Sequence, residues 1–132
     1  MRKCLGCIII KESETMLISE VFCMRYIRVP KDTAAEIAYD HGEQTAEQVV
    51  ELKISENDFL RLWELGIFND INNACDSLID DYEDEVLKGI QLPKTVEVLD
   101  RYLSDSDDRI IQRIKEMVLQ AIEYGTCVGF DF

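Results

Sequence analysis

The sequence predicts an α+β fold, a single small domain over residues 1–132, with a few strands and with helices dominating after residue 55. A length of 132 residues is typical of one domain, and 47% hydrophobic residues are enough to bury a core. Short runs rich in isoleucine and valine indicate strands, whereas apolar residues that recur every three or four positions later in the chain indicate helices. The strand-like runs are too unevenly spaced for a repeating βαβ fold.

Residues 1–48 predict strands and one irregular stretch. Cys4–Ile10 is short, apolar and rich in isoleucine, which favours a buried strand. Met16–Val29 is ambiguous, because its first part has helical spacing while its second part suits a strand that ends at Pro30. Residues 32–48 are expected to be irregular or weakly helical, with a turn at residues 40–42.

A strand and a helix are expected next. Val49–Ile54 alternates apolar and polar side chains after its first residue, as a half-exposed strand does. Ser55 is a suitable N-cap, and Asp58 three residues later is an acidic variant of the capping box. The helix should end near Gly66 and turn its apolar side chains inward: Phe59, Leu62, Trp63 and, at its end, Leu65.

The most regular apolar stripe predicts one long helix between residues 68 and 86. Its members recur at three- and four-residue steps: Phe68, Ile71, Cys75, Leu78, Ile79, Tyr82 and Val86. Leu78 and Tyr82 are therefore expected to face the core. On the outer face of this helix Asp76, Asp80 and Asp84 would stack one above another, with Glu83 beside them.

Two more helices and a terminal strand complete the prediction. Pro93 favours a helix start, and the inner face of that helix would hold Val96, Leu99, Tyr102 and Leu103. Residues 104–108 are rich in N-cap residues and place negative charge at the start of the last helix. Gly125 is its expected C-cap, and residues 126–132 suit a strand. The core stripe of the last helix is Ile110, Ile111, Ile114, Met117, Val118, Ala121 and Ile122.

The negative charge is concentrated in the middle of the chain. The whole sequence has a formal net charge of −13, and between Asp32 and Leu87 it carries sixteen acidic residues and only two basic ones, Lys53 and Arg61. Such a field repels nucleic acid and anionic membranes and attracts basic partners. The sequence therefore predicts a basic protein partner, with no direct nucleic-acid or membrane binding.

The densest acidic cluster is the predicted binding site. No lysine or arginine lies between Glu64 and Leu87, so no nearby cation offsets the repulsion there. The partner-binding candidates are Asp76, Asp80, Asp81, Glu83, Asp84 and Glu85. A plain solvated face is the competing interpretation. A divalent-metal site is disfavoured, because an EF-hand would need a central glycine and a di-iron centre would need paired Glu-x-x-His motifs. No metal or other cofactor is expected.

The cysteines and the N-terminus indicate a cytoplasmic protein. Five cysteines are an odd number without a regular framework, which fits thiols in a reducing compartment better than a secreted, disulfide-linked domain. Cys4 and Cys7 form a lone C-x-x-C pair, interpreted as structural thiols because zinc would need two more ligands and His41 is the only histidine. The apolar run that ends at Lys11 is at the bottom of the length range for a signal peptide, and no stretch approaches the roughly 20 apolar residues of a membrane helix.

No catalytic pattern accompanies these features. His41 is expected to be an exposed turn residue, and the chain has no nucleophile-elbow, Walker or dinucleotide-binding motif, so it is not predicted to be an enzyme. Aromatic residues often anchor interfaces, and the exposed candidates are Trp63, Tyr39 and Tyr124. Trp63, beside Phe59 and Leu62, is more typical of a core residue.

Two segments resemble bacterial immunity proteins. Residues 54–87, which begin Ile-Ser-Glu-Asn-Asp-Phe-Leu-Arg-Leu-Trp, and the closing residues 125–132, Gly-Thr-Cys-Val-Gly-Phe-Asp-Phe, are similar in texture to proteins that accompany contact-dependent inhibition and other polymorphic toxins. The resemblance implies a small, acidic, cytoplasmic protein that caps a cognate toxin domain without catalysis. The first 50 residues do not contribute to it, and it assigns no functional residue.

The predicted function is therefore that of a non-catalytic immunity protein, which neutralises a basic toxin domain such as a nuclease through an acidic surface. An inhibitor that meets a basic, nucleic-acid-binding surface gains encounter rate from complementary charge. The alternative is a phage-encoded acidic nucleic-acid mimic that blocks a nuclease such as a CRISPR effector. A small enzyme of unrecognised class is a further alternative.

Overall fold

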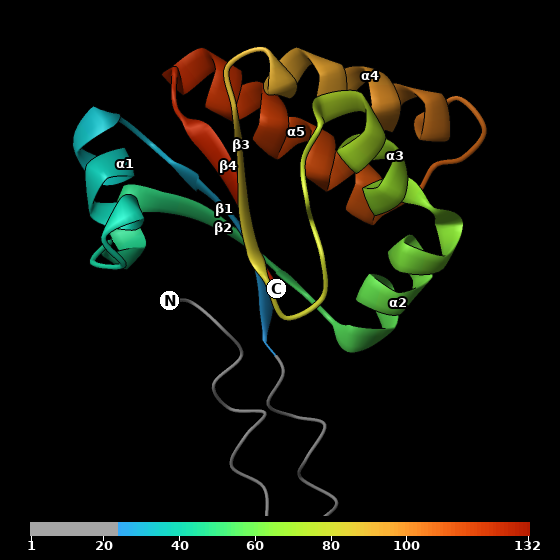
Figure 1. Ribbon diagram of the computed structural model, residues 1–132, viewed down its shortest axis with the longest axis horizontal. Coiled ribbons are helices and arrows are strands. Elements are labelled where there is room, and N and C mark those ends of the chain that lie inside the picture. The colour runs from blue at the N-terminus through green and yellow to red at the C-terminus, as the bar shows by residue number, and fades with distance from the viewer. Residues whose placement is uncertain (1–23) are drawn as a thin grey trace, which may run out of the picture.

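A computed structural model describes residues 24–132, which form an antiparallel sheet with helices packed against it (Figure 1). The elements along the chain are β1 (Arg25–Pro30), α1 (Thr33–Asp40), the 3-10 helix η3 (Ala46–Gln48), β2 (Val49–Ile54), α2 (Glu56–Leu65), α3 (Ile67–Cys75), β3 (Asp84–Lys88), α4 (Gln91–Leu103), α5 (Arg109–Tyr124) and β4 (Cys127–Asp131). Within the described residues the sheet has four strands in the order β2-β1-β4-β3, and every neighbouring pair is antiparallel. The α+β class is confirmed, as is the dominance of helices after residue 55.

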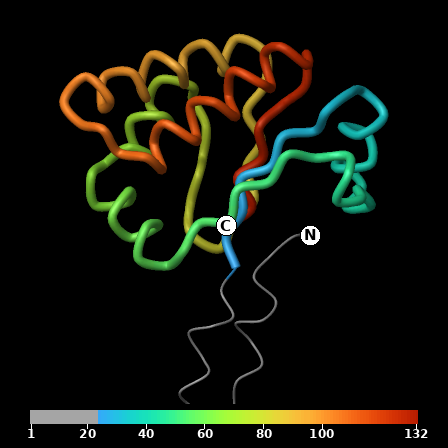
Figure 2. The backbone as a smooth tube through the Cα atoms, turned by 180° about the vertical axis from the view of Figure 1, so that it is seen from behind, coloured from blue at the N-terminus to red at the C-terminus, as the bar shows by residue number. Residues whose placement is uncertain are grey.

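The helices from α2 to α5 lie on one side of the sheet (Figures 1 and 2). α5 packs against the central strands β1 and β4, α4 lies beside α5, and α3 packs against α4. The core between these layers includes Ile27, Val29, Leu87, Val128 and Phe130 from the strands, Phe132 directly after β4, and Phe59, Leu62, Phe68, Leu99, Ile114 and Met117 from the helices. No helix within residues 24–132 is both long enough and apolar enough to cross a membrane.

β4 is a central strand, paired with β1 on one side and β3 on the other. All five of its residues are buried, and the terminal strand predicted for residues 126–132 is confirmed. On the face opposite the core, α1 places the ring of Tyr39 over Gly129. A Cβ atom at residue 129 would lie 1.6 Å from the Tyr39 hydroxyl oxygen, so only glycine fits there.

The expectations for the first half of the chain are met in part. β1 confirms the strand at the end of Met16–Val29, while the beginning of that range and the strand expected at Cys4–Ile10 lie outside the described residues. Residues 32–48 are more helical than expected, because the Asp32 carboxylate accepts a hydrogen bond from the Ala35 N–H and caps α1.

Most helix ends lie where the sequence predicts them. Ser55 and Asp108 cap α2 and α5 by accepting hydrogen bonds from backbone N–H groups of the first turn. Gly66 and Gly125 end the same two helices with φ values of 87° and 71°. Pro93 lies in the first turn of α4, where its missing N–H costs nothing. These signals are local, so the sequence alone is sufficient to reveal them.

The single helix predicted between residues 68 and 86 is wrong. Helix α3 ends at Cys75, residues 76–83 form no regular element, and β3 begins at Asp84. Leu78 and Tyr82, expected in the core, are 78% and 49% exposed. We call residues 76–85 the acidic segment.

The side chain of Asn72 explains why the helix stops. Its Oδ1 accepts hydrogen bonds from the Ile79 N–H and the Ser77 hydroxyl, and its Nδ2 donates to the Ile79 carbonyl. Asp76 adopts a left-handed conformation, with φ 56° and ψ 46°, and ends α3. The polar contacts of Asn72 replace the next helical turn and bury Ile79, so the apolar stripe continues through a loop.

The exposure of the aromatic residues also differs from the sequence prediction. Tyr39, expected at the surface, is fully buried. Trp63, expected to turn inward, is 41% exposed although its ring contacts Phe59 and Phe68, and Leu65 is about half exposed. Tyr124 is 36% exposed, in agreement with its prediction.

Candidate acidic interface

The six predicted site residues lie in the acidic segment, which leaves α3 and returns as the edge strand β3 (Figure 1). The stack of Asp76, Asp80 and Asp84 on a helix face is wrong, because no helix exists there. Asp76, Asp80 and Glu83 are exposed, whereas Asp81, Asp84 and Glu85 are half-buried. The structure thus brings the six carboxylates into one segment without aligning them on one face.

Hydrogen bonds within the acidic segment fix its shape. Glu85 Oε2 accepts from the Leu78 N–H at 2.7 Å, and Asp80 Oδ1 accepts from the Asp81 N–H at 2.8 Å. The Phe132 N–H donates to the Glu83 carbonyl at 3.3 Å, which attaches the segment to the end of β4. The backbone N–H groups balance part of the charge of Glu85 and Asp80, whereas Asp76 and Glu83 are exposed and form no ion pair with a described residue.

A buried arginine joins the acidic segment to β1 and α2. Arg25 is 1% exposed, its Nε lies 3.1 Å from Glu56 Oε1 and its Nη1 lies 2.6 Å from Asp81 Oδ1. The guanidinium carbon lies 3.8 Å from the centroid of the Phe59 ring and 5.3 Å from that of Tyr82. Burial lowers the pKa of Arg25, but the hydrogen bonds to Glu56 and Asp81 outweigh burial, and the pKa is raised overall. Arg25 therefore stays charged and holds both carboxylates.

A second arginine lies on the opposite face of the sheet. Arg28 is held between Glu51, at 2.6 Å, and the buried carboxylate of Asp131, at 2.8 Å. The Tyr39 hydroxyl donates to Asp131, whose two oxygens lie 2.8 and 3.0 Å from it. The burial of Tyr39 is explained by this contact, which no local sequence pattern predicts.

A third arginine is shared in the same way, since Arg61 pairs with both Asp58 and Asp108. Partial burial raises the pKa of the Asp108 carboxyl. The hydrogen bond from Arg61 and those from two backbone N–H groups of α5 outweigh burial, so the pKa is lowered overall. Each of the three arginines between residues 24 and 87 is thus bound to two carboxylates. The positive charge of each arginine is therefore already neutralised by carboxylates of this protein and is not available to bind a phosphate.

Many other carboxylates have no ion pair with any described residue. Between residues 32 and 87 these exposed or half-exposed side chains are Glu36, Asp40, Glu43, Glu47, Glu64, Asp76, Asp80 and Glu83. Four of them lie on α1 and in the connection to β2, a second acidic area that the sequence analysis did not single out. A count of acidic and basic residues over residues 32–48 would have indicated this second acidic area from the sequence. Both areas repel anions and favour a basic surface.

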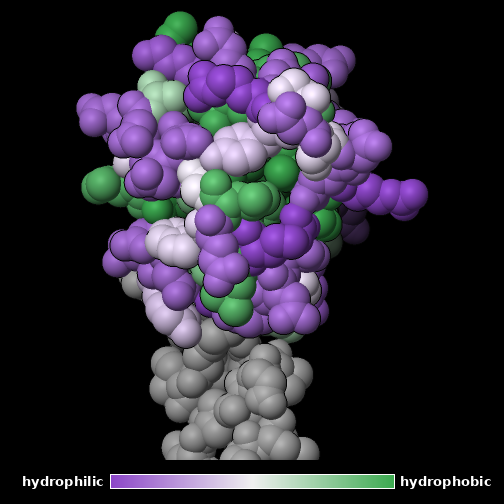
Figure 3. Space-filling model, turned by 90° about the vertical axis from the view of Figure 1, so that its right-hand side faces the viewer, coloured by the Kyte–Doolittle hydropathy of each residue, from purple (hydrophilic) through white to green (hydrophobic). Residues whose placement is uncertain are grey.

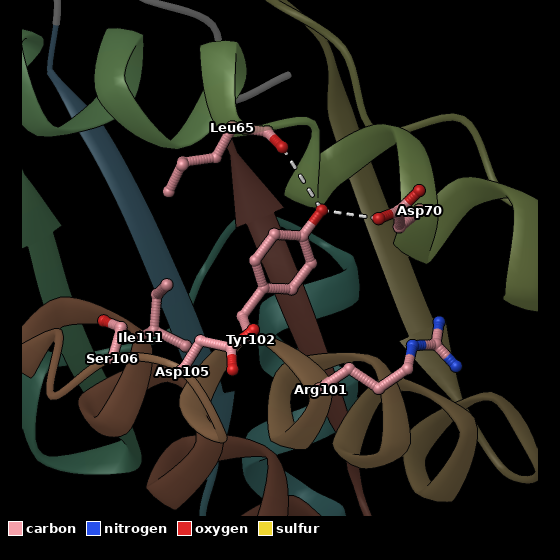
Figure 4. A pocket seen from close by; sticks show the side chains of 7 residues that line it. All are labelled: Leu65, Asp70, Arg101, Tyr102, Asp105, Ser106 and Ile111. Atoms are coloured by element: carbon pink, nitrogen blue, oxygen red, sulfur yellow. Dashed lines mark hydrogen bonds between the residues drawn. The ribbon is translucent and has the colours of Figure 1, made fainter.

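A shallow pocket of about 350 Å³ lies between the end of α2, α3, and the α4–α5 connection (Figure 4). Its lining residues are Leu65, Asp70, Arg101, Tyr102, Asp105, Ser106 and Ile111. The Tyr102 hydroxyl donates to Asp70, and the Leu65 carbonyl lies 3.3 Å from the same oxygen. Partial burial and the Asp70 carboxylate raise the pKa of Tyr102 to about 12, so the hydroxyl stays protonated at neutral pH. This contact joins α4 to the α2–α3 corner and offers no activated nucleophile.

The side of the molecule that carries α2 and the α4–α5 connection is mostly hydrophilic, with hydrophobic side chains showing between the polar ones (Figure 3). Such a mixed surface is typical of non-obligate protein interfaces, which are about as apolar as the rest of a protein surface.

Cys75, Cys127 and His41 lie within the described residues. Cys75 and Cys127 are buried thiols, and burial, together with Glu36 and Asp40, raises the pKa of Cys127 to about 12. Cys4 and Cys7 lie outside the described residues. His41 is exposed in the turn after α1, as predicted. Among residues 24–132 no three histidine, cysteine, aspartate or glutamate side chains converge to hold a metal ion.

No protein-family model and no curated protein sequence matches the chain. One solved structure with a similar fold is described as "Neisseria DNA mimic protein DMP12". The two share 18% sequence identity with a TM-score of 0.56, over 83% of this chain and 98% of that one. At this identity the likeness supports the fold.

Proposed function

We propose that this protein is a non-catalytic inhibitor that binds a basic, nucleic-acid-binding protein by presenting carboxylates where that protein expects phosphates. The observation that carries the proposal is the state of the arginines between residues 24 and 87. Arg25, Arg28 and Arg61 are each bound to two carboxylates, so only Lys31 and Lys53 remain as unpaired cations beside the many exposed carboxylates of this part of the chain.

The similar solved structure supports this proposal, because its description names a protein that mimics DNA and because nearly its whole length shares this fold. A surface that binds DNA draws a large share of its affinity from cations that contact phosphates, and a rigid array of carboxylates can occupy the same cations. Folded elements that hold the acids in place, as Asn72 and Arg25 do for the acidic segment, reduce the entropy lost on binding.

Two narrower versions of the proposal differ in the partner. If the partner is a secreted toxin nuclease, the protein is an immunity protein of a contact-dependent inhibition or other polymorphic toxin system. If the partner is a host or CRISPR nuclease, the protein is a phage-encoded mimic. A toxin gene directly upstream favours the first version, and a phage operon favours the second.

The first experiment is affinity capture on the immobilised protein from a lysate of the organism that encodes it. Captured proteins are eluted first with double-stranded DNA and then with salt, and are identified by mass spectrometry. We expect a basic nucleic-acid-binding protein in the DNA eluate, because DNA and this protein compete for one surface.

Competition is then measured with the purified partner. Increasing concentrations of this protein should release fluorescently labelled DNA from the partner, because both occupy the same cationic surface. If the partner is a nuclease, its activity should fall in parallel. A ternary complex, in which DNA and this protein bind the partner together, would contradict mimicry.

A further inference from the structure

A continuous row of aromatic rings runs across α2 and the acidic segment. The rings of Phe59 and Trp63 are stacked with centroids 5.7 Å apart, since the two residues lie four positions apart on one helix face. The Arg25 guanidinium lies over the Phe59 ring and reaches to the ring of Tyr82. Trp63 and Tyr82, distant in sequence, are thus connected through two buried side chains.

Both ends of this row face solvent. Trp63 is 41% exposed and Tyr82 is 49% exposed, although large aromatic side chains are usually buried. Tyr82 has a φ of 61°, a left-handed conformation that costs energy for a bulky residue. Backbone strain of this kind persists where the surrounding contacts hold it, and it clusters at functional sites.

The contacts of Arg25 indicate which chemical group this surface recognises. Its guanidinium is bound by an aromatic face and by two carboxylates, those of Glu56 and Asp81. At the surface, an exposed glutamate directly follows each of the two exposed rings in the sequence, Glu64 after Trp63 and Glu83 after Tyr82. Both glutamates are exposed, and neither forms an ion pair with another described residue.

We infer that Trp63 and Tyr82 are the anchor residues of the interface and hold arginine side chains of the basic partner, an inference that rests on the proposed function. Each ring would stack against a guanidinium, and the excess of acidic residues between Asp32 and Leu87 would attract that cation. Arginine fits this site better than lysine, because its planar group is more weakly hydrated and stacks on aromatic faces. Buried aromatic residues at an interface carry a large share of the binding energy, whereas charges at the rim mainly accelerate association.

The test compares an oligo-arginine peptide with an oligo-lysine peptide of equal length as probes. Binding is measured by titration calorimetry at several salt concentrations, and by the emission of Trp63, which is the only tryptophan in the chain. We expect the arginine peptide to bind about tenfold more tightly and to quench Trp63 more strongly, because two stacked guanidinium groups each add a cation–π contact.

The decisive variant carries Trp63→Leu and Tyr82→Asn together. Leucine preserves an apolar contact with Phe59, and asparagine tolerates the left-handed backbone of residue 82. The preference for the arginine peptide should fall below about twofold, while the affinity for the lysine peptide changes little. Tyr124→Leu is the matched control, since Tyr124 is an exposed aromatic residue on α5, outside the row, and its removal should leave the preference intact. Circular dichroism melts verify that all variants are folded.

An unchanged preference in the double variant, or an equal loss in the Tyr124→Leu control, would overturn the inference. The result is separable from the proposed function. If a DNA-binding partner binds the wild type and the double variant equally well, the role of Trp63 and Tyr82 as anchor residues is rejected and the proposal of nucleic-acid mimicry is kept. A preference lost only in the double variant, together with no competition against DNA by any captured partner, would keep the guanidinium site and remove the mimicry.

Discussion

Arg25 connects β1, α2 and the acidic segment through Glu56, Asp81 and the carbonyl oxygen of Phe132. The guanidinium is buried, whereas the two carboxylates are about 40% exposed. The contribution of these ion pairs to stability is therefore expected to lie between that of a surface pair and that of a fully buried pair. The residue also supplies packing, since its guanidinium covers the Phe59 ring.

Replacing Arg25 with methionine should therefore destabilise the fold by about 1–3 kcal/mol, because Glu56 and Asp81 lose their cation while the apolar packing is partly kept. Urea unfolding followed by circular dichroism measures the change. The matched control is Arg113→Met, which removes a surface pair with Glu116 at 3.5 Å and should cost less than about 0.5 kcal/mol. Equal losses for both variants would mean that the Arg25 contacts add no more than a surface pair.

Tyr102 gives a pH-dependent prediction. Its pKa is raised from 10.0 to about 12 in the folded protein, so the unfolded chain releases this proton first as the pH rises. The stability from the Tyr102–Asp70 contact is therefore complete below pH 10 and is lost between about pH 10 and 12. Tyr102→Phe should be less stable by about 0.5–1.5 kcal/mol at neutral pH. Wild type and variant should converge at alkaline pH in urea titrations. A constant difference up to pH 12 would contradict this role.

At the scale of the elements, the sequence correctly predicted the helix ends that depend on nearby residues. The caps Ser55 and Asp108 and the end at Gly125 depend on residues within one helical turn, and all three lie where predicted. The false helix between residues 68 and 86 had an equally regular pattern. The prediction fails because the Asn72 side chain forms hydrogen bonds with the backbone of Ile79, seven residues later, in a loop. A periodic apolar pattern does not distinguish a further helical turn from a loop that buries Ile79.

The sequence located the acidic cluster, and it was wrong about the helical geometry of that cluster. The concentration of acidic residues identified the acidic segment directly, because acidic residues can be counted in the sequence without knowledge of the fold. The pairing of Asp81 with Arg25 spans 56 positions, and that of Tyr39 with Asp131 spans 92, so neither leaves a local trace. For the same reason the exposure of Trp63 and Tyr82 could not be inferred from their neighbours in sequence.

Neutralising the acidic segment should weaken binding without unfolding the protein. The variant Asp76→Asn, Asp80→Asn and Glu83→Gln leaves out Asp81, whose pairing with Arg25 supports the fold, and asparagine tolerates the left-handed backbone at residue 76. Association with the partner should slow by about tenfold at low salt and depend less on salt, because these charges steer the encounter.

Rates measured by surface plasmon resonance over a range of salt concentrations test this prediction. The matched control neutralises three other exposed acids that lack an ion pair with described residues, Asp105, Asp107 and Glu123. If control and variant slow association equally, net charge alone determines the rate and the acidic segment is a solvated face.

At the scale of the whole molecule, the charge of −13 implies self-repulsion in the folded state. Arg25, Arg28 and Arg61 neutralise part of it, but many carboxylates between residues 32 and 87 have no cation among the described residues. The distribution explains how the protein remains folded while keeping a negative surface.

Moderate salt should therefore raise the thermal midpoint by a few degrees, since the Debye length falls to about 10 Å at 0.1 M and screens the like charges. Differential scanning calorimetry at low and moderate sodium chloride, with ionic strength varied by a second salt as control, measures the shift. A flat or falling midpoint would show that the ion pairs of the arginines already outweigh the repulsion.

The central position of β4 has a consequence for how the protein is made. Ile27 pairs with Phe130, so the middle of the sheet joins segments that are translated far apart in time. While residues 127–131 are still inside the ribosome, β1 and β3 have no common neighbour, and the carbonyl of Phe132 that binds Arg25 does not yet exist. The nascent chain therefore cannot complete the contacts that join Arg25 to the acidic segment and to Phe132 until β4 has emerged from the ribosome.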